Sequence, residues 1–385
     1  MRKLKKMKIV FNSNIMNHHQ LGLCDEISNI VGKNNFSFIA NEPLPVEKKD
    51  LGYQDDNKIR DYIIRPYGDQ KAMAEKALNS ADFIINTFGQ GIKEIKTQLR
   101  DGKRILWYNE RLFKDYNFVK TSAKYIRAKY YFSYGKDSNL YFLNASYYGY
   151  KDICALKNKS WANRCYQFGY FPLLPEKKYR KSIQTEELRL LFVGRLLDWK
   201  HPDLVLECAK YLKAKNVRFH IQIIGIGPLF DYIKKKIAAL GFMDSIELLG
   251  AISSEKINYY YQTNDAFLFL SDRREGWGAV LNEAMANGCI PIANIEAGAS
   301  LCLISEGKNG FLYKNKEELF EKTIQIEQIK KSNNFFAISN NSINTIFNEW
   351  NYHIVANRLV EMLENILFGE VTPDLYDSGP LEKSK

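Results

Sequence analysis

The sequence predicts an α/β protein with two doubly wound domains, and three observations lead to this class. Apolar, strand-like runs alternate with helical patterns along most of the chain, as they do in parallel sheets covered by helices. The chain has 385 residues, which is too long for one ordinary core and suggests two domains. A charged, proline-bearing stretch, residues 172–187, separates two such series and is predicted to be the linker.

The first series is predicted to form a domain over residues 1–171. Its apolar runs are short, as is typical of strands buried within a sheet. Strands are expected at residues 8–11, 36–40, 62–65, 83–86 and 104–107, and helices at residues 70–80 and 91–100 and after the polar loop 12–20.

The second series is predicted to form a domain over residues 188–345. Each strand is followed closely by a helix, which indicates right-handed crossovers in a doubly wound sheet. Strands are expected at residues 188–193, 218–224, 245–249, 266–270 and 289–293, and helices at residues 202–214, 229–240 and 254–261 and from position 279. A last helix is expected over residues 346–368, and residues 369–385 are predicted to be a frayed tail.

Composition limits the partner and the compartment. The net charge of +11 and the pI near 9.1 favour an anionic partner, whether nucleotide phosphates, an acidic membrane surface or nucleic acid. The six cysteines lack the spacing of a metal or redox site, which favours a reducing cytoplasm. The N-terminal apolar run is too short for a signal peptide, and no stretch is apolar enough to predict a membrane-spanning helix.

Two carboxylates mark the loop that follows the apolar run 266–270. Glu275 and Glu283 are separated by seven residues, and a helix is expected to begin between them. The residues directly after the first carboxylate are Gly276, Trp277 and Gly278. The helical rise puts the carboxylates roughly 8–12 Å apart, wider than the roughly 5–5.5 Å of a retaining glycosidase pair. We therefore expect them to hold two parts of one elongated ligand, with its phosphates on the amides between them. The alternative is an amphipathic helix with Glu283 as a solvated charge.

Cations and glycines end two other strands of the second series. Arg195 and Lys200 lie five residues apart in the loop after the first strand, where they can converge on one diphosphate. An ordinary pair of solvated surface charges is the alternative. Gly225 and Gly227 end the next strand in the same kind of place, although a lone Gly-x-Gly is a weak signal.

Residues 111–150 mix aromatic side chains with lysine and arginine. A basic aromatic helix can lie on an anionic membrane surface. A half-buried helix whose lysines are merely solvated is the alternative. The spacing matches no nucleic-acid-binding motif, so no nucleic acid partner is expected.

Five motifs occur in an order that resembles family-4 glycosyltransferases of the GT-B fold. They are VGRLLDWKHPDLVLECAKYL, IIGIGP, GFMDSIELLGAIS, SDRREGWGAVLNEAMANGCIPIA and EGKNGFLY, within residues 188–313. Parts of the first domain are similar to a bacterial surface-polysaccharide subgroup, namely residues 17–20, 41–45, 109–111 and 168–171. The resemblance implies two Rossmann-like domains that face each other across a cleft, with a C-terminal helix that crosses back to the first domain.

The resemblance also implies an activity. The chain would be a retaining, metal-independent glycosyltransferase of the hexosyltransferase type, working in capsule, lipopolysaccharide or glycolipid synthesis. Its donor would be a nucleotide sugar, most simply UDP-linked, and its acceptor a glycan or lipid-linked saccharide at the cytoplasmic membrane face. No cofactor and no essential metal is expected, because Arg195, Lys200 and a helix N-terminus would replace Mg²⁺ as the counter-charge.

The same resemblance implies a role for each motif residue. Arg195, Lys200 and the amides of Gly276, Trp277 and Gly278 would bind the donor diphosphate. Glu275 would contact the donor sugar at the reacting centre, and Glu283 the ribose hydroxyls. The nucleobase would be bordered by Gly225, Gly227, Ala251 and Ile252. The acceptor would be held by Asn17, Gln20, Asn109, Glu110 and Arg111.

His18 and His19 are candidates for a catalytic role in the first domain. Members of the family often use a first-domain histidine on a later loop, but that loop here reads Tyr108-Asn109-Glu110-Arg111. Our hypothesis is that His18 or His19 faces the acceptor and bonds to it, or accepts its proton, near neutral pH. The alternative is that the histidines cap the following helix.

Two positions depart from the family pattern, and two other functions remain open. His201 stands where the family usually has glycine, and Cys302 stands near the place of the usual glutamate.

A nucleotide-sugar epimerase on the same fold would turn over the donor without an acceptor. A non-enzymatic basic module would bind membrane or nucleic acid in a salt-sensitive way.

Overall fold

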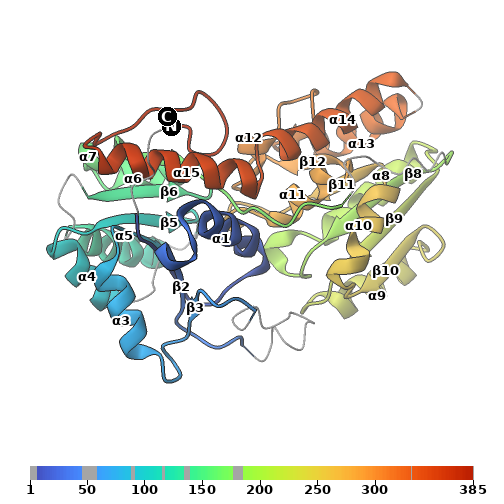
Figure 1. Cartoon of the computed structure of the whole chain (residues 1–385). Coiled ribbons are helices and arrows are strands. Elements are labelled where there is room, and N and C mark those ends of the chain that lie inside the picture. The colour runs from blue at the N-terminus through green and yellow to red at the C-terminus, as the bar shows by residue number, and fades with distance from the viewer. Residues whose placement is uncertain are drawn as a thin grey trace. The chain divides into compact units, whose positions relative to one another are not determined.

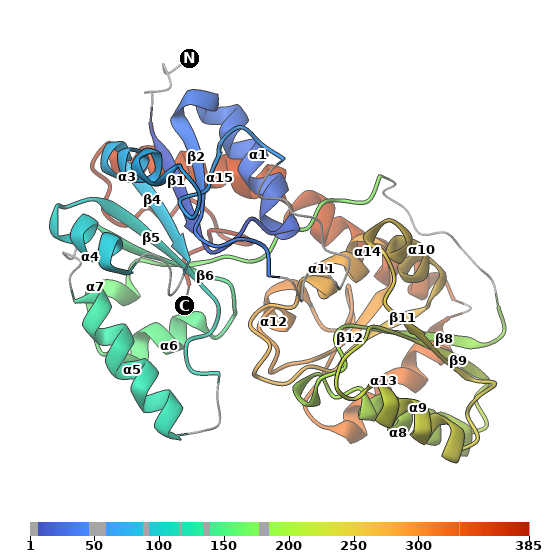
Figure 2. The same ribbon diagram turned by 90° about the horizontal axis from the view of Figure 1, so that it is seen from below.

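The computed structural model describes residues 7–45, 59–87, 92–114, 118–133, 139–176, 185–330 and 332–384. The chain divides into two compact units, one made of Met1–Leu173 with Trp350–Lys385 and the other of Leu174–Glu349. Most of the expected linker, residues 177–184, lies outside the described residues. Each unit is described by itself (Figures 1 and 2).

In the described part of the first unit, seven parallel strands form one sheet in the order β3-β2-β1-β4-β5-β6-β7. The strands are β1 (Ile9–Ser13), β2 (Phe36–Ala40), β3 (Ile63–Ile64), β4 (Phe83–Thr87), β5 (Arg104–Asn109), β6 (Leu140–Asn144) and β7 (Cys165–Gln167). The helices are α1 (His18–Val31), α3 (Lys71–Ser80), α4 (Ile92–Arg100), α5 (Phe118–Phe132), α6 (Gly149–Ala155) and α7 (Lys159–Ala162), with a 3₁₀ turn, η1, at Lys33–Asn35. The strand order reverses between β1 and β4, and open sheets of this kind bind ligands at such a switch point.

The doubly wound class is therefore confirmed, and most of the basic and aromatic residues noted in 111–150 lie on the helix α5. The helix α5 ends at Phe132, and the later part of the segment includes the strand β6, which lies between β5 and the edge strand β7 of the parallel sheet. All five side chains of β6 are buried. The aromatic residues of this strand belong to the core, whereas the basic and aromatic residues that suggest a surface helix precede it.

The C-terminal helix α15 (Tyr352–Leu367) packs on α1 within the first unit, and Figure 1 shows the two side by side. Gly22 of α1 makes this approach possible, because a Cβ atom there would lie 2.9 Å from the ring of Tyr352. The chain leaves the second unit after α14 (Asn333–Asn348), so the expected domain boundary at position 345 falls inside that helix.

The tail after α15 is ordered, so the prediction of a frayed end is wrong. The Leu381 amide donates to the Gln167 carbonyl at 2.7 Å, and the Ser384 amide donates to the Cys165 carbonyl at 2.9 Å. Tyr166 and Lys383 form an antiparallel bridge. The tail thus pairs with the exposed edge of β7, and the buried side chain of Leu381 anchors it.

In the described part of the second unit, six parallel strands form a sheet in the order β10-β9-β8-β11-β12-β13. The strands are β8 (Leu188–Val193), β9 (Phe219–Ile224), β10 (Ile246–Gly250), β11 (Ala266–Phe269), β12 (Ile290–Asn294) and β13 (Phe311–Tyr313). The other elements are η3 (Asp198–Lys200), α8 (Asp203–Ala214), α9 (Phe230–Ala239), α10 (Ser254–Thr263), α11 (Ala279–Ala286), α12 (Ser300–Leu303), α13 (Lys316–Ile329) and α14. Here the order reverses between β8 and β11.

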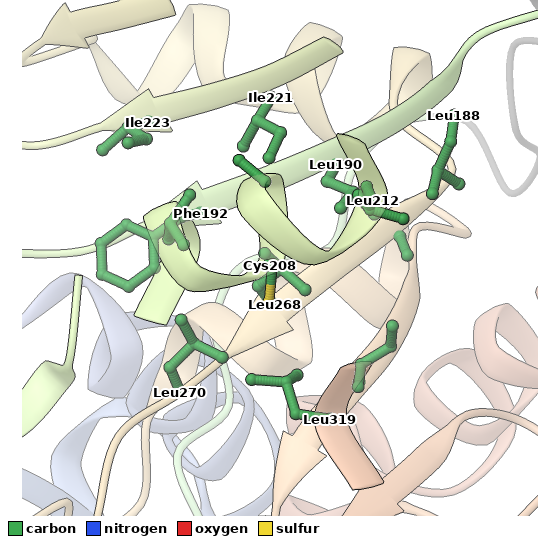
Figure 3. Close-up of a cluster of buried hydrophobic side chains, with 14 of the residues drawn as sticks. Leu188, Leu190, Phe192, Cys208, Leu212, Ile221, Ile223, Leu268, Leu270 and Leu319 are labelled. Carbon is green, nitrogen blue, oxygen red and sulfur yellow. The ribbon is translucent and has the colours of Figure 1, made fainter. Parts of the chain in front are cut away.

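The core of the second unit lies between this sheet and its helices. Figure 3 shows Cys208 and Leu212 of α8 among the leucine and isoleucine side chains of β8 and β9. Both α8 residues are fully buried, as their helical spacing predicts for the face turned to a sheet. The core fixes the strand ends from which the next loops project.

Within the described residues, no helix is long and apolar enough to cross a membrane. Within the described residues the six cysteines form no disulfide, and four of them are buried.

Candidate functional site

The loop between β11 and α11 lies at the switch point of the second sheet, where the sequence predicts the donor site. Gly278 precedes α11 with a φ of 93°, in the left-handed region. A Cβ atom at this position would lie 2.3 Å from the ring of Phe269. Only glycine therefore allows the loop to turn this tightly from the strand into the helix. Gly276 and Trp277 are buried in the same turn, and the Trp277 indole donates to Asn282 at 2.8 Å.

Glu275 and Lys200 meet at this switch point. The Lys200 Nζ donates to the Glu275 carboxylate at 2.5 Å, and the Ser271 hydroxyl donates to the same oxygen at 3.0 Å. Both charged side chains are about nine-tenths buried, with 12% and 11% exposure. The structure therefore brings together two of the predicted donor residues, one from each loop. Arg195 lies on the same loop as Lys200 but is exposed.

A second set of charges, not predicted from the sequence, ties these two loops together. Arg274 donates to Asp272 at 2.8 Å and to Asp198 at 2.8 Å. Burial opposes ionisation of Asp272, yet the bonds from Arg274 hold the pKa of that carboxyl below its ordinary value. The Asp272 amide also donates to the Trp199 carbonyl at 3.0 Å. The two adjacent arginines in Asp-Arg-Arg-Glu could have suggested an ion pair. The partner of Arg274, Asp198, lies 76 residues earlier in the chain, so sequence spacing does not identify it.

The same network explains the departure at His201. This residue has a φ of 48°, in the left-handed region that glycine occupies most easily. Its Nε2 atom lies 3.3 Å from the Asp272 carboxylate. His201 thus adopts a backbone conformation that is less favourable for it than for glycine, but its side chain makes a contact with Asp272 that glycine could not make.

The glycines at the ends of β8, β9 and β10 pack backbone against backbone. A Cβ atom on Gly225 would lie 1.9 Å from the Gly194 carbonyl oxygen, and one on Gly227 would lie 2.7 Å from the Leu196 carbonyl oxygen. The Gly225 amide donates to the Gly250 carbonyl at 2.7 Å. Close backbone packing therefore explains why Gly225 and Gly227 are glycines, whether or not a nucleobase binds beside them. Ala251 and Ile252 follow directly after β10, exposed and half-buried respectively.

Glu283 projects from the middle of α11 and is half-buried. It accepts a hydrogen bond from the Tyr261 hydroxyl at 3.1 Å. Burial raises the pKa of Glu283 to about 7, and the bond from Tyr261 opposes this in part. The alternative of a merely solvated surface charge is therefore wrong. Cys302, at the other departure, lies half-buried in α12, with its thiol 3.6 Å from the Gly298 carbonyl.

The first unit has a pocket of about 510 Å³ at its own switch point. It lies where β1, β4 and β5 end, as the doubly wound order predicts. All seven residues predicted for the acceptor side line it: Asn17, His18, His19, Gln20, Asn109, Glu110 and Arg111. The pocket is also lined by Lys114, Lys124 and Tyr170, which lie in segments already noted but were not predicted for this site.

The N-terminus of α1 forms one wall of this pocket. Asn17 is the cap residue, and the Gln20 side chain accepts from the Asn17 amide at 3.2 Å, which is a capping box. The alternative that His18 and His19 cap the helix is therefore wrong. Their rings contact each other with centroids 3.6 Å apart, and the His19 ring lies parallel to Tyr170 at 5.8 Å.

The opposite wall is a charged network centred on Glu110. One carboxylate oxygen accepts from the Tyr170 hydroxyl at 2.5 Å, and the other accepts from Lys114 at 3.0 Å. The Arg111 guanidinium lies over the Tyr148 ring at 4.5 Å. Tyr170 therefore joins the two walls through one ring and one hydroxyl.

Comparisons with known proteins bear on the second unit most directly. Residues 175–340 match the family described as Glycosyl transferases group 1. These residues form a group 1 glycosyltransferase domain. The chain is 28% identical over 200 residues to the amylovoran biosynthesis glycosyltransferase AmsK of Erwinia amylovora, covering 50% of this chain and 49% of AmsK. It is 31% identical over 130 residues to the putative colanic acid biosynthesis glycosyltransferase WcaL of Salmonella typhimurium, covering 32% of each. The chain thus spans about half or less of the curated relatives it matches.

Solved structures of glycosyltransferases are similar to both units of this chain, not only to the glycosyltransferase domain. A crystal structure of HepE from Anabaena in complex with UDP has a TM-score of 0.69 and 14% identity, covering 93% of this chain and 100% of HepE. The apo form of the lipopolysaccharide outer core galactosyltransferase WaaB has a TM-score of 0.67 and 16% identity, covering 94% and 100%. At such identities the likeness concerns the fold alone. With two Rossmann-like parallel sheets, the fold is GT-B.

Proposed function

We propose that the whole chain is a glycosyltransferase that moves a sugar from a nucleotide sugar, UDP-linked, to a glycan or lipid-linked saccharide of surface polysaccharide or glycolipid synthesis. The observation that carries this proposal is the Lys200–Glu275 pair at the switch point of a group 1 glycosyltransferase domain. Relatives named for amylovoran and colanic acid biosynthesis, and the UDP complex of HepE, support the donor and acceptor classes.

In this proposal the donor diphosphate lies between two sources of positive charge. Lys200 and Arg195 provide the cations, and the amides of 276–278 lead into the N-terminus of α11. Glu275, oriented by Lys200 and Ser271, contacts the donor sugar, and Glu283 contacts the ribose. No divalent metal is then required, because fixed cations stabilise the departing nucleotide diphosphate.

The experiment that tests the activity offers a panel of radiolabelled nucleotide sugars with and without membrane extract. We expect label to move to an extractable acceptor only when membrane extract is present. Consumption of donor without acceptor would instead indicate an epimerase or hydrolase. If no donor is consumed under any condition, the transferase proposal is wrong.

Two finer features of the reaction need their own measurements. Retention predicts that the glycosidic bond formed from an α-linked donor is α, which the anomeric proton coupling in an NMR spectrum of the product reports. Metal independence predicts an unchanged rate after EDTA treatment, and a rate restored only by added Mg²⁺ would contradict it.

Peripheral contact with an anionic membrane also belongs to this proposal. The helix α5 carries Lys120, Arg127 and Lys129 beside its exposed face and no acidic residue. Val119, Ile126 and Tyr130 recur at helical spacing and are 74%, 68% and 51% exposed. An exposed apolar stripe flanked by cations suits an anionic lipid surface. We expect the protein to float with phosphatidylglycerol vesicles and not with phosphatidylcholine vesicles, and Ile126→Asp to reduce this binding.

A further inference from the structure

Two adjacent tyrosines lie in the loop between β6 and α6, at the carboxyl end of a strand of the first sheet. Tyr147 is 50% exposed, and Tyr148 is half-buried. Their ring centroids lie 5.4 Å apart and the ring planes stand at 87°, so the two rings meet edge to face. In this tyrosine pair the half-buried ring therefore supports the exposed one.

The sheet places the tyrosine pair beside the loop that lines the pocket of the first unit. The last residues of the neighbouring strands β5 and β6, Asn109 and Asn144, are paired in register (Figure 1). The Ala145 amide donates to the Asn109 carbonyl at 2.8 Å, so the two strands lead into their loops side by side. Arg111, which lines the pocket, has its Cζ atom 4.5 Å from the centroid of the Tyr148 ring. The tyrosine pair thus continues the pocket wall outward.

The two loops are fastened to each other and to α6. Asp152, in the first turn of α6, is 5% exposed and accepts from the Phe113 amide at 3.0 Å. The same carboxylate lies 3.9 Å from the Arg111 Nε atom. Within the loop after β6, the Tyr148 amide donates to the Ser146 hydroxyl at 3.3 Å. A surface that is already ordered loses little conformational entropy when a ligand covers it.

The chemistry of the exposed ring suits the apolar face of a sugar. A tyrosine ring offers a flat apolar area with few rotatable bonds, and its hydroxyl remains in contact with water. The C–H groups on one face of a pyranose make dispersion contacts with such a ring. The hydroxyl groups around the edge of the same pyranose stay accessible to solvent. A sugar can therefore cover Tyr147 without burying polar groups that lack partners.

The geometry of the two rings alone does not indicate a ligand, and the second unit shows why. Tyr259 and Tyr260 of α10 also meet edge to face, with centroids 5.6 Å apart, and Tyr259 is 54% exposed. That pair lies on a helix surface. The pair at Tyr147 differs because Arg111 connects it to a pocket of about 510 Å³, within the range of ordinary ligand sites.

From these features we infer that Tyr147 and Tyr148 form a second saccharide subsite, in which the sugar next to the one in the pocket stacks on Tyr147. The acceptor of the proposed transfer is then an oligosaccharide chain rather than a single sugar. This inference rests on the proposed function for the word acceptor, but the stacking belongs to the first unit alone and is measurable without donor.

The test measures binding by saturation-transfer NMR without donor. The probes are maltose, cellobiose, lactose and mannobiose, each compared with the methyl glycosides of its component sugars. Stacking depends on the face of a sugar more than on its hydroxyl pattern, so common disaccharides are suitable probes. We expect at least one disaccharide to bind roughly fivefold more tightly than its methyl glycosides, about 1 kcal/mol. Tyr147→Ala should abolish this preference, and Tyr147→Phe, which keeps the ring, should retain it.

Tyr259→Ala is the matched control, because it removes a comparably exposed ring from the tyrosine pair of the second unit. It should leave the preference for disaccharides intact. Equal losses from Tyr147→Ala and Tyr259→Ala would overturn the inference, as would a wild-type protein that binds disaccharides no more tightly than single sugars.

Octyl glucoside tests whether the ring binds a lipid chain instead of a sugar. If Tyr147→Ala weakens binding of octyl glucoside but of no disaccharide, the surface takes an alkyl chain and the saccharide subsite is wrong. UDP-glucose turnover in the same preparation keeps the two proposals apart. Its absence would contradict the transferase, whereas the preference for disaccharides would still be measurable.

Discussion

At the scale of single residues, the pKa of the Glu283 carboxyl lies near neutrality. Burial raises its pKa from 4.5 to about 7. If this carboxylate accepts from the ribose hydroxyls, ligand binding favours the ionised form. The affinity for UDP-glucose should therefore rise as pH increases from about 6 to about 8. The diphosphate of UDP-glucose does not titrate in this range, so calorimetric titrations over pH isolate the protein group.

Glu283→Gln is the matched control for that experiment. It keeps the shape of the side chain and its contact with Tyr261 but cannot ionise. We expect its affinity to be independent of pH. In the unliganded protein, the unfolded chain loses this proton at a lower pH than the folded chain, so the free energy of unfolding should fall between pH 4.5 and about 7. A wild-type affinity that stays flat across pH 6–8 would exclude Glu283 from the ribose site.

At the scale of elements, the two loops of the donor site act as one piece because Arg274 joins them. Arg274→Met removes its bonds to Asp272 and to Asp198. We expect the Kd for UDP-glucose to rise roughly tenfold, about 1.4 kcal/mol, because Lys200 and Glu275 are then no longer held in register. The rate with saturating donor should change less, since Arg274 is not proposed to touch the reacting atoms. Arg218→Met removes an exposed ion pair just before β9, at the amino end of that strand and so away from the donor loops at the carboxyl ends, and should leave the Kd unchanged.

A buried ion pair secures the other end of the second sheet. Lys330, at the end of α13, binds Asp265 at 2.7 Å, and the two side chains are only 8% and 3% exposed. Lys330 also donates to the Glu187 carbonyl just before β8. Lys330→Met should cost roughly 3–5 kcal/mol of unfolding free energy, because it leaves a carboxylate buried without its cation.

The control for that change lies on the same helix. Lys322 of α13 pairs with Glu306, whose side chain is 47% exposed, so Lys322→Met should cost less than about 1 kcal/mol. Chemical denaturation of both variants supplies the comparison. Similar losses from the two substitutions would show that burial of the Lys330 pair has no special effect on stability.

The elements also show how far the sequence could lead. Strands β8 to β12 were predicted within one or two residues, because long βα repeats with short loops leave little choice. Strands β7 and β13 have three residues each and carry too little periodicity to be recognised. The donor loops were predicted from glycines and charges. The ion pairs between these loops were not predicted, because Lys200 and Glu275 are 75 residues apart and only the sheet order brings them together.

At the scale of the whole molecule, the residues after the second unit return to the first unit, and the tail that follows α15 packs there. Arg358 of α15 donates to the carbonyls of Ser378 and Pro380 at 2.7 and 2.9 Å, and the Tyr166 hydroxyl donates to the Pro373 carbonyl at 3.0 Å. Together with the pairing along β7, these bonds cover an edge strand that would otherwise expose its amides and carbonyls. Local sequence gave no sign of this, because the tail is polar and has no regular pattern.

Removal of the tail after Phe368 should therefore weaken the first unit and promote self-association through β7. Leu381→Asp tests the same contact with one substitution, since Leu381 is 2% exposed and loss of a buried leucine costs roughly 1.5–3 kcal/mol before the charge is counted. Val371→Asp, at a tail position that is 44% exposed, is the control and should be neutral. Thermal unfolding and size-exclusion chromatography of the three variants give the comparison. Affinity for UDP-glucose should persist in all of them, because the donor residues belong to the second unit. A truncated protein as stable and monomeric as the full chain would mean that the tail contributes nothing to the edge it covers.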